Sequence, residues 1–78
     1  MYTITNITHT EKEQVWQDET TRYWFEMEVD GEPERFAVAD TNGALSILDS
    51  EGHPLPESPL RDHLLRTLTP HYIRNIYE

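Results

Sequence analysis

Apolar and polar side chains alternate along the middle of the chain. Between Arg22 and Val29 every second residue is apolar, and these residues are Tyr23, Phe25, Met27 and Val29. A period of two is typical of a strand with one apolar face. Asp30-Gly31 follows directly and supplies two residues that tolerate positive φ, as a type I′ hairpin turn requires. The pattern therefore predicts a hairpin that turns at Asp30-Gly31.

A two-residue loop at Asp30-Gly31 also fixes the register of this hairpin. The pairs that it creates are Phe25 with Phe36, Tyr23 with Val38, Trp24 with Ala37, and Glu26 with Arg35. Aromatic pairs and pairs of opposite charge are favourable across two strands. Pro33 then lies opposite Glu28 in a non-hydrogen-bonded pair, where its missing N–H removes no ladder bond.

A second turn is expected at Asp40-Thr41-Asn42-Gly43, because aspartate can accept bonds from turn amides and glycine can adopt positive φ. If all four residues form the loop, Val38 pairs with Leu45 and Phe36 pairs with Ile47. A three-residue loop would place Ser46 opposite Val38 and interrupt the apolar face. The hydrophobic pattern therefore favours the four-residue loop.

The C-terminal third has helical signals. Ser58-Pro59 reads as an N-cap followed by proline at the first helical position, and an apolar stripe predicts a helix over about 59–68. Thr69-Pro70 repeats the cap and the proline, which predicts a break and a second helix over 70–77. A strand over 72–77 is the alternative for this last segment.

The N-terminal segment is rich in threonine and β-branched residues, which favours a strand from Tyr2 to about Thr8. The stretch 10–17 is open to two interpretations. Thr10 and Glu13 could form a capping box that starts one helical turn, whereas Val15-Trp16 also fits a strand, which we favour.

These elements predict an α+β fold in a single domain spanning 1–78. A three-stranded antiparallel meander over 22–49, extended by the N-terminal strand, packs against the C-terminal helices. The expected core consists of Tyr23, Phe25, Phe36, Val38, Leu45 and Ile47. The chain has 78 residues and no cysteine, so neither disulfides nor thiolate-bound zinc can support this small core. No stretch is apolar for long enough to span a membrane and none reads as a targeting segment, which makes the cytoplasm the expected location.

Trp24 falls on the strand face opposite this core, next to small residues. The four-residue loop places Ala37 and then Ser46 in its row. This face is either an exposed binding platform or a second buried layer covered by the N-terminal segment. The covered layer is favoured because Trp16, Ile4 and Tyr2 also need apolar neighbours.

Acidic residues occupy every second position around the predicted turn, and they are Glu26, Glu28, Asp30, Glu32 and Glu34. On one straight strand their carboxylates would lie about 6.8 Å apart, which resembles a row of phosphates. The turn at Asp30-Gly31 divides this row, so the five acids should form a compact acidic tip with charge on both faces. Arg35 is expected to neutralise Glu26 at its base.

The overall charge is −9, and thirteen of the 15 acidic residues lie within 11–57. A surface of this sign repels nucleic acid and anionic membranes and attracts basic partners. The sequence has no nucleophile elbow and no phosphate-binding glycine loop. The acids on the predicted strands are expected to face water, where nothing would separate the pKa values of two carboxyls into an acid and a base. Asp40-x-Asn42-Gly43 matches only part of a calcium-binding loop, and the four histidines lack ligand spacing. We therefore expect no enzyme activity, no cofactor and no bound metal.

Two kinds of function fit these features. The first is an interaction module, of the DNA-mimic or inhibitor kind that phages and mobile elements use against CRISPR or restriction systems. Its acidic tip would block a basic groove of a nucleic-acid-binding protein, with Trp24 as an apolar anchor. The second is a small-ligand-binding or structural domain that uses the Trp24 face. Unpaired outer strands could also join two copies into a homodimer.

Overall fold

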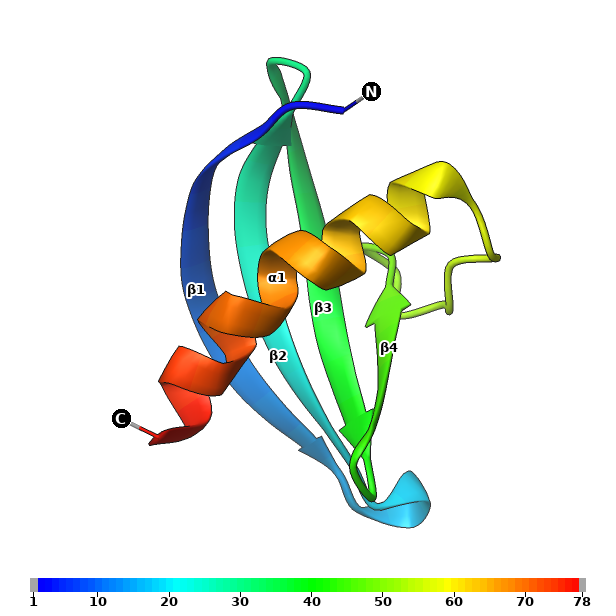
Figure 1. Cartoon of the computed structure of the whole chain (residues 1–78). Coiled ribbons are helices and arrows are strands. Elements are labelled where there is room, and N and C mark those ends of the chain that lie inside the picture. Colours follow the sequence, from blue (N-terminus) through cyan, green and yellow to red (C-terminus); the bar gives the residue numbers. More distant parts are fainter. Residues whose placement is uncertain (1, 78) are drawn as a thin grey trace.

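The computed structural model is a four-stranded antiparallel sheet with one C-terminal helix across one face (Figure 1). It describes residues 2–77, without the side chains of Asp18 and Tyr77. The elements are β1 (Ile4–Val15), the short 3-10 helix η1 (Trp16–Asp18), β2 (Thr20–Val29), β3 (Glu32–Thr41), β4 (Ala44–Leu48) and α1 (Pro59–Tyr77). The strands follow one another in the order β1-β2-β3-β4. The α+β class is confirmed.

The β2–β3 hairpin has the register that the sequence predicts. Phe25 lies opposite Phe36, and Trp24 lies opposite Ala37. Asp30 and Gly31 both have positive φ, 51° and 84°, as a type I′ turn requires. The alternation of apolar residues and the turn dipeptide agree with each other here, so one register satisfies both.

The predicted register of β3 and β4 is wrong by two residues. Val38 pairs with Ile47 rather than with Leu45, because the loop contains only Asn42 and Gly43. Both loop residues have positive φ, 53° and 90°, so they form a second two-residue turn of the Asn-Gly kind. A shift of two residues leaves every side chain on its predicted face. The apolar face therefore consists of the same residues in the predicted and in the observed register.

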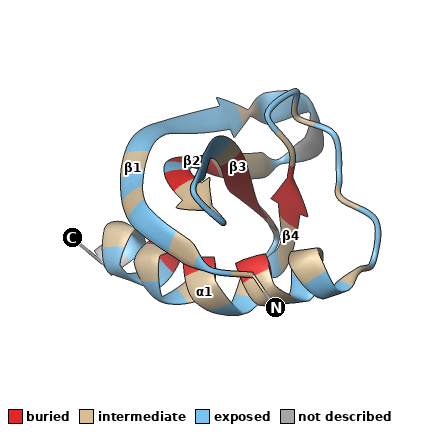
Figure 2. Ribbon diagram, turned by 90° about the horizontal axis from the view of Figure 1, so that it is seen from above, coloured by how far each residue is buried: buried red, intermediate tan, exposed pale blue. Residues whose placement is uncertain are grey.

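β1 is one long strand, and its continuation to Val15 excludes a helical turn that starts at Thr10, while Trp16 lies in η1 rather than in the favoured strand. Its pairing with β2 is irregular between Thr5 and Thr8 and again between His9 and Glu11. Such bulges bend a strand and increase its twist. β1 starts near α1 and ends on the opposite side of β2 and β3 (Figure 2). One strand therefore borders both faces of the sheet.

The helix does not break at Thr69-Pro70, so both the prediction of two helices and the alternative strand are wrong. α1 continues from Pro59 to Tyr77 with Pro70 inside it. Ser58 is the N-cap as predicted, because the Arg61 amide donates to its Oγ at 3.1 Å. Buried side chains occur at i, i+4 and i+8, and they are Leu64, Leu68 and Tyr72. Their packing on the sheet extends across the proline and holds the two halves in one helix.

The core has two layers. The larger layer lies between α1 and the sheet, and its buried members are Tyr23, Phe25, Met27, Phe36, Val38, Ile47, Leu64, Leu68 and Tyr72. Five of the six predicted core residues are therefore buried, while Leu45 is partly buried at the rim. The smaller layer, on the other face, consists of Trp24, Ala37, Ala39 and Leu48. Both faces of the central strands are thus covered (Figure 2).

Replacement of Pro70 tests the continuous helix. Proline in a helix interior lacks one amide donor and crowds the preceding turn, so Pro70→Ala should stabilise the protein by about 1–3 kcal/mol. Urea denaturation measures this change. Pro59→Ala is the matched control, because proline is favourable at the first helical position and its removal should bring no gain. An unchanged or lower stability of Pro70→Ala would instead indicate a helix that starts at this proline.

Candidate acidic interaction surface

Trp24 is buried, with only 5% of its surface exposed. The observed register places Ala37 and Leu48 in its row, in place of the predicted Ala37 and Ser46. Leu48 therefore fills the space beside the indole that the predicted register assigned to a small polar residue. The question that the sequence left open is answered in favour of a covered layer.

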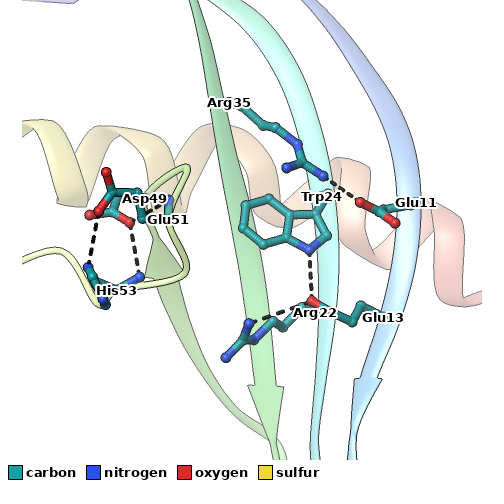
Figure 3. Close-up of polar contacts among 8 residues, drawn as sticks. All are labelled: Glu11, Glu13, Arg22, Trp24, Arg35, Asp49, Glu51 and His53. Atoms are coloured by element: carbon teal, nitrogen blue, oxygen red, sulfur yellow. Dashed lines mark hydrogen bonds and ion pairs between the residues drawn. The ribbon is translucent and has the colours of Figure 1, made fainter.

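The cover over Trp24 is made of charged side chains (Figure 3). The guanidinium of Arg35 lies 4.1 Å from the centre of the indole ring, and Arg35 also pairs with the carboxylate of Glu11. The indole Nε1–H donates to Glu13 at 3.2 Å, and Arg22 approaches the same carboxylate at 3.5 Å. These contacts join the second half of β1 to β2 and β3 across the indole.

Trp16 does not provide the cover that the sequence suggested, because 80% of its surface is exposed. Ile4 does not provide it either, since it packs against the larger core on the helix side. The sequence signal for the real cover was the placement of Glu11 and Glu13 two residues apart on one strand. Their side chains reach Arg35 and Trp24 only because a bulge between His9 and Glu11 resets the register of β1.

The same contacts neutralise the middle of this sheet face. Glu11 and Glu13 are each within ion-pair distance of an arginine. Arg35 lies opposite Glu26 in the register, as predicted, but its ion pair is with Glu11, so the predicted neutralisation of Glu26 is wrong. Within residues 2–77, the acids nearer the β2–β3 turn have no arginine or lysine at ion-pair distance.

The five acids Glu26, Glu28, Asp30, Glu32 and Glu34, which we term the acidic tip, gather at the end of the β2–β3 hairpin. None of them forms an ion pair within the described residues 2–77. Glu28 is half-buried and the other four are exposed. The tip, at one end of the molecule (Figure 1), therefore concentrates five carboxylates that have no ion pair among the described residues.

Two members of the acidic tip are fixed in place by the start of β1 and the residue before it. The Thr3 amide donates to Asp30 Oδ1 at 2.8 Å, while the Asp30 amide donates to the Thr3 carbonyl at 2.8 Å. The side-chain amide of Asn6 donates to the Glu28 carboxylate at 2.8 Å. Hydrogen bonds of this kind orient a carboxylate without cancelling its charge, so the tip keeps a defined shape.

A shallow hollow of about 530 Å³ adjoins the acidic tip. Its lining includes Asn6, Thr8, Glu26, Glu28, Pro33 and Arg35. Three of the five tip acids, Glu26, Glu28 and Glu34, therefore border a concave surface. A concave surface bordered by carboxylates can surround the end of a basic side chain, which an isolated surface carboxylate cannot do.

Three of the six lysine and arginine side chains lie on the helix. Arg61, Arg66 and Arg74 all lie in α1, where Arg61 pairs with Asp62 at 3.7 Å. The protein is thus polarised, with its arginine-bearing helix on one face and its acidic tip at the end of the sheet. Such a charge distribution orients an approaching basic partner before contact.

One hydrogen bond between α1 and the sheet was not predicted from the sequence. The buried Tyr72 donates its hydroxyl hydrogen to Asp40, which also accepts from the Gly43 amide at 2.8 Å. This contact ties the C-terminal half of α1 to the β3–β4 turn. Asp40 therefore has a structural role in this turn.

A second structural carboxylate is Asp49, in the turn after β4 (Figure 3). Its Oδ1 accepts from the amides of His53 and Glu51, each at 2.9 Å. The hydrogen bond from His53 is the main cause that lowers the pKa of Asp49 below 3.8. The ionised form of Asp49 therefore stabilises the connection between β4 and α1.

No group of three or more histidine, aspartate or glutamate side chains among the described residues could hold a metal ion. Within the same residues, no helix is both long and apolar enough to cross a membrane. No protein-family profile matches the chain, and neither does any curated protein or solved structure. Function is therefore inferred from the charge and geometry of the acidic surface.

Removal of the guanidinium over Trp24 should loosen this layer. Arg35→Ala is expected to cost about 1–2 kcal/mol of unfolding free energy, because it removes both the cation–π contact and the ion pair. In a Trp16→Phe background, Trp24 emission should also shift to the red as water reaches the indole. Arg35→Lys keeps the charge but not the planar stacking group, so its stability and its emission should lie between those of the wild type and Arg35→Ala. Unchanged emission and stability in Arg35→Ala would contradict this role.

The pKa of Asp49 predicts a pH dependence. Because the folded pKa is lowered, its contribution to stability is present above pH 3.8 and is lost as the pH falls through and below that value. Asp49→Ala should therefore lower the melting temperature at neutral pH, and the difference from the wild type should shrink in acid. Asp49→Asn, which keeps an acceptor oxygen, should lose less. A difference that stays the same at neutral and acidic pH would rule out this linkage.

Proposed function

We propose that this protein is a non-enzymatic interaction module whose acidic tip enters a basic groove of a partner protein. The observation that carries the proposal is the absence of ion pairs at all five tip carboxylates within the described residues 2–77. Glu11 and Glu13, on the same sheet, are both paired. The charge is thus neutralised where the sheet packs and remains free where it projects.

Free charge at a projecting end suits contact with a basic groove. Carboxylates without an ion pair have no internal ion pair to lose when they meet arginine or lysine, whereas paired ones must first break that contact. The hairpin turn is narrow, so it can enter a cleft. The hollow beside Glu26 and Glu28 gives a basic side chain of the partner a concave surface to occupy.

The groove that fits best is one that otherwise binds nucleic acid, because such grooves display closely spaced basic side chains. Occupation by the acidic tip would exclude the nucleic acid. We accordingly place the protein among inhibitors of nucleic-acid-handling systems, of the anti-CRISPR or anti-restriction kind, which act in the cytoplasm. No direct contact of this protein with nucleic acid or membrane is part of the proposal.

Several observations favour this function over ligand binding or self-association through the Trp24 face. Trp24 is enclosed by Arg35 and Glu13 and offers little free surface. The outer edge of β4 is partly occupied, since the Leu55 amide donates to Ile47 and the Asp49 amide donates to the His53 carbonyl. The bulges in β1 likewise make its edge less suited to pairing with a second copy.

Charge neutralisation at the acidic tip tests the proposal. Wild-type protein immobilised as bait should recover its partner from a lysate of the source cells, and Glu32→Gln with Glu34→Gln should weaken that binding about tenfold. The matched control is Glu51→Gln with Glu57→Gln, which removes the same charge from the loop before α1 and should leave binding unchanged. Affinities are measured by titration of the purified partner at low and moderate salt.

Two further results decide the matter. The wild-type affinity should fall on the order of tenfold between low and moderate salt, because a charge-dominated contact is screened. The bound partner should also lose its nucleic acid in a mobility-shift assay. A partner that binds the tip variant and the loop variant equally well, or that binds nucleic acid normally in the complex, would overturn the proposal.

A further inference from the structure

Trp16 is the most exposed large apolar side chain among the described residues, with 80% of its surface accessible. The next are Ile73 and Ile76, at 45% and 39%. Trp16 lies in η1, at the end of the sheet opposite the acidic tip (Figure 1). Tryptophan is enriched among the residues that dominate protein interfaces, which makes this exposed indole a candidate contact residue.

The backbone around Trp16 forms a hydrogen-bonded turn. The Glu19 amide donates to the Trp16 carbonyl at 3.4 Å, and Glu19 has a positive φ of 52° that closes the turn. Val15 and Thr20 pair directly beneath it, and the hydroxyls of Thr20 and Thr41 lie 2.7 Å apart. A side chain presented by an ordered turn loses less conformational entropy on binding than one on a mobile loop.

A hollow of about 390 Å³ lies beside the indole. Its lining is Gln14, Val15, Trp16, Glu19, Thr20 and Thr21. An aromatic residue, an acidic residue and two threonines therefore line one recess. This combination suits a group that is flat, positively charged and rich in hydrogen-bond donors, which describes the guanidinium of arginine.

The protein contains an internal precedent for this combination. At Trp24, the guanidinium of Arg35 lies over the indole and pairs with Glu11. Trp16 and Glu19 also line one recess, but the basic residues nearest to them in the sequence make other contacts: Lys12 Nζ lies 5.7 Å from the ring centre of Tyr23, and Arg22 pairs with Glu13. Trp16 and Glu19 thus correspond to Trp24 and Glu11, but within the described residues no arginine pairs with Glu19 or lies over the Trp16 ring.

We infer that Trp16 and Glu19 form a second binding site, which receives an arginine side chain of the same basic partner that the acidic tip engages. This inference rests on the proposed function. The two sites lie at opposite ends of the sheet, so a partner with a long basic groove would contact both. The acidic tip would supply charge, while Trp16 would supply selectivity for arginine over lysine.

The test uses an octa-arginine peptide and an octa-lysine peptide as probes, titrated into the full-length ¹⁵N-labelled protein at low salt. The indole Nε1–H signals of the two tryptophans are resolved separately. The Trp16 signal and the Glu19 amide should shift with octa-arginine, at an affinity about threefold or more above that for octa-lysine. The buried Trp24 indole is the internal control and should not shift.

Variants complete the test. Trp16→Leu should abolish the preference for arginine, and Glu19→Gln should weaken octa-arginine binding at this site about threefold. Glu57→Gln is the charge-matched control and should change neither. Because Trp16 is exposed, Trp16→Leu should keep the dispersed spectrum of the folded protein, which verifies that the variant is intact.

The Gly31 amide reports separately on the acidic tip. A shift of Gly31 without any shift of Trp16 would overturn the arginine site and leave the proposed function in place. A shift of Trp16 with Gly31 unmoved would support the arginine site and count against the acidic tip. Equal binding of the two peptides at Trp16 would also overturn the inference.

Discussion

The antiparallel pairing of β2 with β3 is the constraint on which the rest of the structure depends. Its register places Phe25 opposite Phe36 on one face and Trp24 opposite Ala37 on the other. Each face must then be covered, because both expose large aromatic surface. α1 covers the first face and the second half of β1 covers the other, so one short hairpin determines where every other element packs.

This register also explains how a protein with a charge of −9 remains compact. Carboxylates that lie close to packed apolar groups have partners, as Glu11 and Glu13 do around Trp24. Carboxylates at the hairpin end face water, where mutual repulsion is screened and costs little. The protein can therefore keep an unpaired acidic tip without loss of its core. We regard this division of charge as the physical basis of its proposed role.

The sequence predicts the fold best where two local signals agree. Asp30-Gly31 and the apolar alternation both require one β2–β3 register, and that register is present. At the next turn the alternation cannot distinguish loops that differ by two residues. The Asn42-Gly43 dipeptide is the signal that distinguishes them, because it favours a two-residue turn. At Pro70 tertiary packing overrides the local signal for a helix break, since Leu64, Leu68 and Tyr72 form one continuous buried stripe. The bulges of β1 have no clear sequence signal, so the spacing of Glu11 and Glu13 does not by itself reveal the cover over Trp24.

Hydrogen–deuterium exchange of the protein bound to its purified partner tests the central claim most directly. If the unpaired carboxylates form the interface, exchange should slow at the amides of 26–34 and should remain unchanged in the middle of α1. Protection confined to α1, with the hairpin end exchanging as fast as in the free protein, would contradict the account. In that case the arginine-bearing helix, rather than the acidic tip, would be the surface that the partner recognises.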